Sequence, residues 1–242
     1  MKRLVIVPVY NEEKSVENVL CNIRNVFDGD ILIINDGSTD RSAEIIRRFT
    51  DVCSLAHPKN LGYGRTLIDG FNFALENGYD RLVTIDCDEQ HQPQTIPMIF
   101  ENMGDVDIYS GSRYLHETIS DDAPPPDRYS INMRITKEIN DVTGYGLTDS
   151  FCGMKGYRVK ALEPMDLRES GYGFPIEFWI QVCHFGLTVT EFPVARIYKN
   201  LNRSFGEKLD NPDVRLVHYL EILNREVQRW SISSPLERTR TM

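Results

Sequence analysis

The chain has 242 residues, of which 41% are hydrophobic and 26% charged, so it is long enough to bury a substantial core. Its formal net charge of −9 argues against a nucleic-acid surface, and a nucleotide ligand would need local Arg or Lys together with a metal ion. The five cysteines contain no CxxC pair, which argues against zinc sites and disulfide frameworks and favours reduced thiols. Because no apolar run approaches the length of a membrane span, we expect a cytoplasmic protein, peripheral to the membrane if its substrate is a lipid.

Short apolar runs alternate with helical patterns in the first half of the chain. A continuous run rich in Val and Ile at 4–9 and an apolar run at 82–85 predict buried strands, and shorter runs at 31–34, 52–56 and 106–110 predict three more strands. Apolar side chains at helical spacing predict one helix capped by Asn11, a second capped by Asp40, and a third over residues 65–77. Strands and helices at this spacing predict an α/β fold, with a mostly parallel sheet and helices on both faces.

The second half of the chain is less regular. An exposed loop with three consecutive prolines is expected at residues 120–127, followed by a helix over 130–142. The later patterns predict a strand at 154–159, a helix at 176–185, a strand at 188–195 and a last helix at 215–230 before a polar tail. We therefore expect a main domain over residues 1–210, and a C-terminal helix and polar tail over 211–242.

Two aspartates, Asp86 and Asp88, directly follow the strand predicted at 82–85. Two carboxylates at the end of a buried strand are costly to leave unpaired, and Mg²⁺ or Mn²⁺ prefers oxygen ligands of this kind. In parallel sheets, ligands collect beyond the carboxyl ends of the strands, where this chain also places Glu12 and Asp36. This convergence predicts a nucleotide and metal site, although the two aspartates alone are equally consistent with a solvated loop.

Five short motifs occur in order, and together the chain resembles family 2 glycosyltransferases, closest to the dolichyl-phosphate mannose synthase branch and related polyprenyl-phosphate glycosyltransferases. The resemblance extends over roughly the first 210 residues. It implies a GT-A fold (a Rossmann-like sheet with an irregular acceptor-side second half), a nucleotide-diphosphate sugar as donor, a divalent metal ion and an inverting transfer. The motifs are Pro8-Val9-Tyr10-Asn11-Glu12, Asn35-Asp36-Gly37-Ser38-Thr39-Asp40, Asp86-Cys87-Asp88-Glu89-Gln90-His91, Gly111-Ser112-Arg113-Tyr114, and Thr148-Asp149 ahead of Cys152-Gly153.

The resemblance also implies roles for individual residues. Arg113 would meet the diphosphate or the acceptor; otherwise it is a surface ion-pair residue. Asp36 would bind the base or ribose, and its alternative is a plain turn and helix cap. The remaining implied roles are base and ribose binding by Pro8, Tyr10 and Glu12, binding of Mg²⁺ or Mn²⁺ at the donor diphosphate by Asp86, Asp88 and Gln90, and closure over the diphosphate by Arg203 and Lys208.

The acceptor decides whether a catalytic base is needed. A polyprenyl phosphate, of the dolichyl type, is already anionic and needs no strong base, whereas a hydroxyl of a soluble glycan or small molecule needs Asp149 or Glu177 as the base. Each of these acids has a structural alternative, Asp149 as a cap before a turn and Glu177 as a favourable charge in a first helical turn. Residues 171–175 lack the basic residue that lipid-phosphate enzymes often carry there, which weakens the lipid-phosphate interpretation.

Two other classes of protein fit the sequence less well. A nucleotidyltransferase normally has a Gly-rich phosphate loop after its first strand, where this chain has residues 8–12 instead. A non-catalytic nucleotide-sugar-binding protein would not need an intact set of acids. The sequence does not identify the sugar, the nucleotide, a membrane partner or the oligomeric state.

Overall fold

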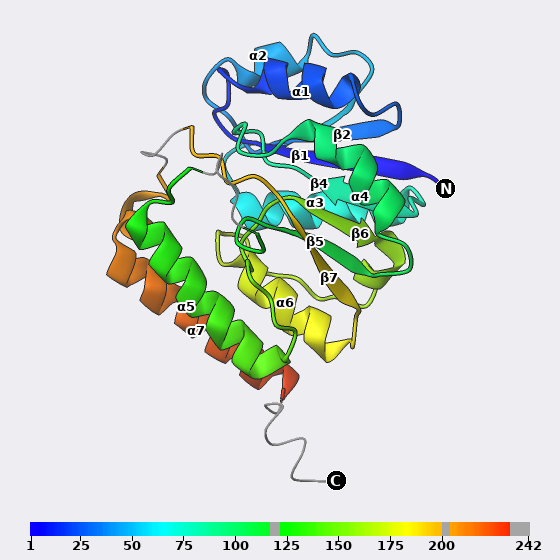
Figure 1. Cartoon of the computed structure of the whole chain (residues 1–242). Helices are drawn as coiled ribbons and strands as arrows, with labels where there is room; N and C mark the ends of the chain where they lie inside the picture. Colours follow the sequence, from blue (N-terminus) through cyan, green and yellow to red (C-terminus); the bar gives the residue numbers. More distant parts are fainter. Residues whose placement is uncertain (117–121, 200–203, 233–242) are drawn as a thin grey trace.

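The computed structural model describes residues 1–116, 122–199 and 204–232, without the side chain of Glu207. Within these residues one sheet has the strand order β3-β2-β1-β4-β6-β5-β7 (Figure 1). All neighbouring strands are parallel except for β6, which runs antiparallel to both β4 and β5. The expectation of a mostly parallel α/β sheet is therefore confirmed. The strands are β1 (Arg3–Val9), β2 (Asp30–Asn35), β3 (Cys53–Ala56), β4 (Arg81–Thr84), β5 (Ile108–Ser112), β6 (Lys155–Arg158) and β7 (Val189–Pro193).

Helices cover both faces of the sheet (Figure 1). Helices α1, α2 and α4 pack on one face, and α3, α5, α6 and α7 pack on the other. Short 3₁₀ turns at 93–95, 159–162 and 207–210 join some of these elements. The helices are α1 (Val16–Arg24), α2 (Ser42–Ile46), α3 (Tyr63–Glu76), α4 (Ile96–Asn102), α5 (Pro126–Thr143), α6 (Phe174–His184) and α7 (Pro212–Trp230).

The continuous apolar runs of β1 and β2 arise because both of their faces are buried. Leu4 and Ile6 point into the core shared with α3, whereas Val5 and Val7 point into the core shared with α1. At about 25 cal/mol per Å² of buried apolar surface, strands buried on two faces are a main source of stability. They fix the positions of the loops at their carboxyl ends.

The structure corrects two predicted helix caps. Asn11 lies at φ 55°, outside any helix, and α1 starts after Ser15. The backbone N–H of Asn11 donates to Ser38 Oγ, and its side-chain oxygen accepts from the N–H of Thr39, so Asn11 joins the loops after β1 and β2. The residue before α2 is Arg41 rather than Asp40, although Asp40 accepts from the N–H of Ser42. Small polar side chains at such turns serve loop geometry as readily as helix capping.

Some element boundaries also differ from the expectations. Helix α4 follows a 3₁₀ turn and was not expected, and α5 begins at Pro126, a turn earlier than residue 130. Proline is favoured at the first position of a helix because its missing N–H would have no partner there. The expected loop at 120–127 lies partly outside the described residues, and 122–125 precede α5 without regular structure.

The C-terminal helix shares the core of the main sheet. Helix α7 buries Tyr219, Ile222 and Leu223 in the cluster that also contains α5 and α6. The division at residue 210 remains a prediction. None of the helices in the described parts of the chain is long and apolar enough to cross a membrane. All five cysteines are free in the structure.

Candidate active site

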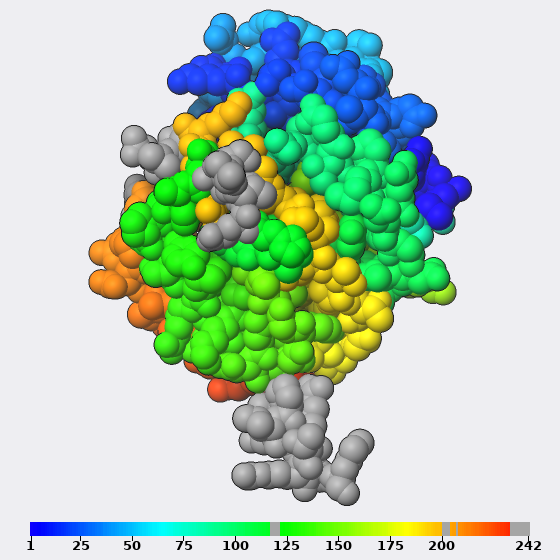
Figure 2. Space-filling model, in the orientation of Figure 1, coloured from blue at the N-terminus to red at the C-terminus, as the bar shows by residue number. Residues whose placement is uncertain are grey.

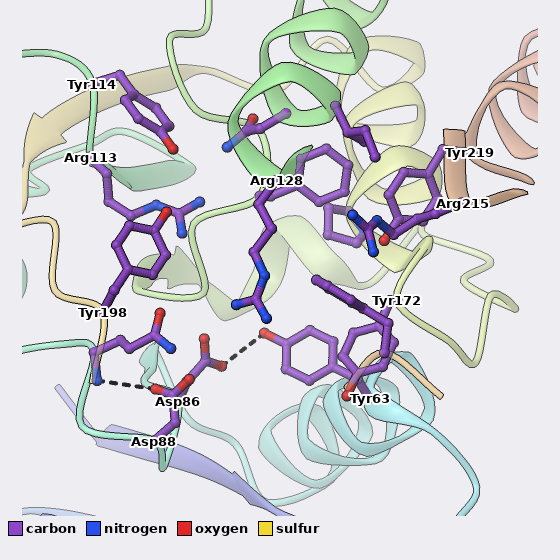
Figure 3. Close-up of a pocket in the computed structure, with 16 residues that line it drawn as sticks. Tyr63, Asp86, Asp88, Arg113, Tyr114, Arg128, Tyr172, Tyr198, Arg215 and Tyr219 are labelled. Atoms are coloured by element: carbon purple, nitrogen blue, oxygen red, sulfur yellow. Dashed lines mark hydrogen bonds between the residues drawn. The ribbon is translucent and has the colours of Figure 1, made fainter. Parts of the chain in front are cut away.

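A pocket of about 170 Å³ lies beyond the carboxyl end of β4, facing the first turns of α5 and α7 (Figure 3). We distinguish three walls by their chemistry. The carboxylate wall consists of Asp86, Asp88 and Gln90. The arginine wall consists of Arg113, Arg128 and Arg215, and the aromatic wall of Tyr63, Phe151, Tyr172, Phe205 and Tyr219.

The carboxylate wall is shaped by the loop that follows β4. The Asp86 carboxylate accepts from the Tyr63 hydroxyl at 3.0 Å through Oδ1, and His91 Nε2 lies 3.5 Å from its Oδ2. A Cβ atom on Gly153 would lie 2.0 Å from Asp86 Oδ2, so the carboxylate occupies space that only glycine leaves open. Asp88 Oδ1 accepts from the backbone N–H of Gln90 at 3.1 Å, which closes a tight turn.

The carboxylate wall has the donor set of a hard divalent cation. Within the described residues, no group of three or more His, Cys, Asp or Glu side chains is placed to hold a metal ion. Mg²⁺ and Mn²⁺ sites at nucleotides do not need such a group, because one or two carboxylates suffice when substrate phosphates and water complete the shell. Two carboxylates and an amide oxygen on one wall of the pocket fit this requirement.

Arg113 is held in place by a buried carboxylate. Asp149 is fully buried and receives hydrogen bonds from Arg113 Nε at 2.6 Å and Arg113 Nη2 at 2.9 Å. Asn132 Nδ2 and the Phe151 N–H donate to the same carboxylate. Burial alone would raise the pKa of Asp149, but the Arg113 guanidinium and these hydrogen bonds hold it below its ordinary value. Asp149 is not among the residues lining the pocket, so its observed contacts orient Arg113.

Arg128 and Arg215 were not among the predicted site residues. The Arg215 side chain is nearly buried, pairs with Asp127 at 2.7 Å and lies 4.3 Å from the ring centre of Phe205. Arg128 lies over the same ring at 5.1 Å. The sequence carries one usable signal, because Arg215 is on the face of α7 that buries Tyr219 and Ile222. A buried arginine among apolar positions usually has a specific partner.

The aromatic wall runs from the carboxylate wall towards α7. Tyr63 stacks on Tyr172 with ring centres 5.9 Å apart, and Tyr172 meets Phe205 edge-on at 5.3 Å. Phe151 stacks on Tyr219 at 5.3 Å. The segment at 171–175, noted above for its lack of charge, thus contributes Tyr172 and Pro175 to the pocket lining. The wall offers apolar surface rather than charge at this position.

The segment after β7 borders the pocket on another side. Tyr198 lines the pocket beside Arg113 (Figure 3), and its backbone N–H donates to Asp122 at 2.8 Å. Lys199 pairs with Glu89, the residue between Asp88 and Gln90, at 2.9 Å. In the space-filling view this segment crosses the face of the molecule towards the N-terminal part (Figure 2).

Residues predicted to bind the base and ribose lie at the carboxyl ends of β1 and β2 and do not line the pocket. Tyr10 is 43% exposed, whereas Pro8 and Glu12 are half-buried. Glu12 accepts from the hydroxyl of Ser15 at 2.8 Å. The nucleotide contacts of these residues remain predictions.

Asp36 points into the protein. Its side chain is nearly buried, and its carboxylate accepts from the backbone N–H groups of Leu61 at 2.8 Å and Gly62 at 2.9 Å. His57 Nδ1 lies 2.6 Å from the same carboxylate, and His57 Nε2 lies 2.9 Å from Asp69. In this arrangement Asp36 ties the end of β2 to the start of α3. A direct bond to ribose remains a prediction.

The other predicted residues lie away from the pocket or outside the described chain. Glu177 is fully buried, accepts from the N–H groups of Arg168 and Glu169, and pairs with Arg229 at 3.2 Å. Burial raises the pKa of Glu177. Lys208 is exposed and is not among the pocket residues, and Arg203 lies outside the described residues.

Comparison with known proteins identifies the family. The sequence profile described as glycosyl transferase family 2 matches residues 4–165. An undecaprenyl-phosphate mannosyltransferase of Micrococcus luteus is 31% identical over 212 residues, which cover 84% of this chain and 87% of that one. A polyprenol monophosphomannose synthase of Mycolicibacterium smegmatis is 26% identical over an alignment that covers 99% of this chain and 90% of that one.

Solved structures support the fold. Glucosyl-3-phosphoglycerate synthase from Mycobacterium tuberculosis in complex with UDP superposes with a TM-score of 0.71 at 16% identity, covering 97% of this chain and 82% of that one. A complex of the same enzyme with Mn²⁺, UDP and glucosyl-3-phosphoglycerate gives a TM-score of 0.69 at 17% identity and covers 97% and 81%. The present chain has the GT-A fold of these glycosyltransferases.

Proposed function

The chain belongs to glycosyl transferase family 2, and we propose that it transfers a hexose, with inversion, from a nucleotide-diphosphate sugar to a polyprenyl phosphate in a reaction that depends on Mg²⁺ or Mn²⁺. The observation that carries this proposal is the chemistry of one pocket. Its carboxylate wall suits a metal-bound diphosphate, its arginine wall suits a second anion, and its aromatic wall suits an apolar chain.

The arrangement of charges favours an anionic acceptor. A cation held by Asp86, Asp88 and Gln90 would neutralise the charge that develops on the departing diphosphate. Arg113 and Arg128, on another wall, would hold an acceptor phosphate by charge-assisted hydrogen bonds, which arginine forms in bidentate fashion. The attacking oxygen and the leaving group would then be neutralised by separate groups of the same pocket.

The available acids argue against a hydroxyl acceptor. Among the described residues that line the pocket, the only carboxylates are Asp86 and Asp88, to which we assign the metal. The two acids considered as bases, Asp149 and Glu177, are fully buried and bound to arginine and backbone groups. A phosphate oxygen is already anionic near neutral pH and needs no proton acceptor, so the pocket suits it without a further group.

The comparisons agree with this acceptor class. The relatives include an undecaprenyl-phosphate mannosyltransferase and a polyprenol monophosphomannose synthase, both aligned over more than four fifths of this chain. Under this proposal the protein works at a membrane surface, where its acceptor resides. Base and ribose binding by Pro8, Tyr10, Glu12 and Asp36, and diphosphate binding by Arg203 and Lys208, remain part of the proposal.

A transfer assay tests the proposal. Labelled GDP-mannose, UDP-glucose and UDP-N-acetylglucosamine are each incubated with Mn²⁺ and undecaprenyl phosphate, undecaprenol or 3-phosphoglycerate. We expect labelled lipid with the phosphate acceptor and one donor, no product with undecaprenol, and loss of product with EDTA or with Asp88→Asn. Transfer to undecaprenol or to phosphoglycerate, but not to the lipid phosphate, would contradict the assigned acceptor.

A further inference from the structure

We propose that Tyr63 is a positioning residue for the metal site, because its phenol fixes the orientation of Asp86. The inference rests on the proposed function, since it assigns Asp86 to the metal. Tyr63 is outside the five motifs of the sequence analysis, and its side chain reaches the carboxylate wall from a different element, the first residue of α3 (Figure 3).

The contact between the two side chains is direct. The Tyr63 hydroxyl donates to Asp86 Oδ1 at 3.0 Å, while His91 Nε2 lies near the other carboxylate oxygen at 3.5 Å. Gly153 closes a further side, since a Cβ there would overlap Asp86 Oδ2. The carboxylate is thus bounded by groups from three segments, and its orientation is set before any ligand binds.

The position of Tyr63 is fixed by the backbone before it. The Asp36 carboxylate accepts from the N–H groups of Leu61 and Gly62, the two residues that precede Tyr63. Gly62 has φ 107°, and a Cβ on it would lie 2.2 Å from the carbonyl oxygen of Ser170. The Arg65 N–H donates to the same carbonyl at 3.0 Å. Asp36, which follows β2, thus holds the backbone that precedes Tyr63, and Tyr63 in turn contacts Asp86 after β4.

This connection gives Tyr63 a function beyond packing. Groups that hydrogen-bond to a metal ligand orient it and tune its affinity, and their loss typically weakens metal binding 10- to 100-fold. The ring of Tyr63 also stacks on Tyr172 of the aromatic wall. Replacing tyrosine by phenylalanine keeps that stacking and removes only the hydroxyl, so the two contributions can be separated.

Tyr79 provides a matched control for this substitution. It also donates a phenolic hydrogen bond to a carboxylate, Asp30 Oδ2, at 2.8 Å, but it does not line the pocket. Both Tyr63→Phe and Tyr79→Phe remove one such bond from a partly or fully buried tyrosine. If the loss of such a hydrogen bond destabilises the fold in general, both variants therefore show that effect.

The experiment is a titration of three proteins with Mn²⁺, namely wild type, Tyr63→Phe and Tyr79→Phe. Each is titrated without nucleotide and with GDP or UDP, and electron paramagnetic resonance measures the concentration of free Mn²⁺ at each point. Melting temperatures are measured in EDTA for all three proteins. We expect Tyr63→Phe to bind Mn²⁺ 10- to 100-fold more weakly than wild type, Tyr79→Phe to bind it normally, and both variants to melt at similar temperatures without metal.

The possible failures are distinguishable. Wild-type Mn²⁺ affinity in Tyr63→Phe would overturn the positioning role and leave the proposed function intact. The role is also overturned if Tyr79→Phe weakens Mn²⁺ binding by the same factor, because the effect is then one of general stability. Absence of Mn²⁺ binding by the wild-type protein, with either nucleotide, would overturn the metal site itself and with it the proposed function.

Discussion

The pairing of Asp149 with Arg113 leads to a quantitative prediction for Asp149→Asn. The substitution leaves the shape of the side chain nearly unchanged but removes its negative charge. That charge balances the guanidinium of Arg113, whose side chain is only 16% exposed. It also places an amide N–H₂ group opposite existing donors. Breaking a buried ion pair in this way costs about 3–5 kcal/mol. At roughly 2–4 °C per kcal/mol for a chain of this size, the melting temperature should fall by about 6–20 °C at pH 7.

The pH dependence of this loss follows from the lowered pKa of Asp149. A carboxyl with a depressed pKa in the folded state stabilises the protein above its unfolded pKa of about 3.9, and this stability is lost as the pH falls through the folded value. The difference in unfolding free energy between wild type and Asp149→Asn should therefore be complete at pH 7 and shrink below about pH 4. Denaturant titration at several pH values measures it.

A double-mutant cycle then distinguishes an orienting role from a role as base. Arg113→Met alone leaves the Asp149 carboxylate buried without its main partner, so the double variant should be more stable than the sum of the two losses predicts, by about 0.5–3 kcal/mol. In the Arg113→Met background, adding Asp149→Asn should not slow transfer further. Additive stability losses, or a further loss of rate of about 10²–10⁴-fold in that background, would refute the reasoning and restore Asp149 as a base.

Three further outcomes are expected. Gly153→Ala should displace the Asp86 carboxylate, because the added Cβ would lie 2.0 Å from its Oδ2. Calorimetry should then show weaker metal-dependent binding of the donor, and unchanged binding would refute the close packing of Gly153 against Asp86. Glu177→Gln should retain most transfer activity, since Glu177 lies outside the pocket. Burial raises the pKa of Glu177, so its contribution to stability is full below about pH 4.3 and declines as the pH rises through the folded value. The difference in unfolding free energy between wild type and Glu177→Gln should therefore become smaller as the pH rises, and a difference that grows with pH would contradict the assignment. Arg128→Met should raise the KM for lipid phosphate more than that for the donor, and the reverse pattern in steady-state kinetics would remove Arg128 from the acceptor site.

Local patterns in the sequence were sufficient to predict the sheet and one wall of the pocket. Strands β1 and β2 are buried on both faces, which makes their apolar runs continuous, and their parallel pairing with each other and with β4 puts the carboxyl ends of these strands on one edge. For that reason Asp86 and Asp88, which lie just after β4, could be placed at this edge from position alone, whereas Gln90 was assigned to the metal from the family resemblance; all three line the pocket. Arg113 follows β5 in the same way, and it also lines the pocket.

The rest of the pocket depends on packing between distant segments. Arg128 and Arg215 meet at Phe205 only because α5 lies beside α7, and no local periodicity encodes that neighbourhood. Tyr63 reaches Asp86 across 23 positions of sequence. Conversely, the sequence suggested that Asp36 could bind a ligand and that Glu177 could act as a base, because acids at strand ends and in first helical turns usually face solvent. Here backbone N–H groups of adjoining segments draw both carboxylates inward.

The central claim is that one pocket holds a metal-bound donor and an anionic acceptor together. The most direct measurement is phosphorus NMR of farnesyl phosphate added to the protein with an unreactive nucleoside diphosphate and increasing Mn²⁺. Paramagnetic Mn²⁺ broadens the signals of nearby phosphorus atoms. We predict broadening of the farnesyl phosphate signal in wild type and much less in Arg128→Met. Broadening of the nucleotide signals alone in wild type would show that the acceptor phosphate binds elsewhere, and would contradict the account.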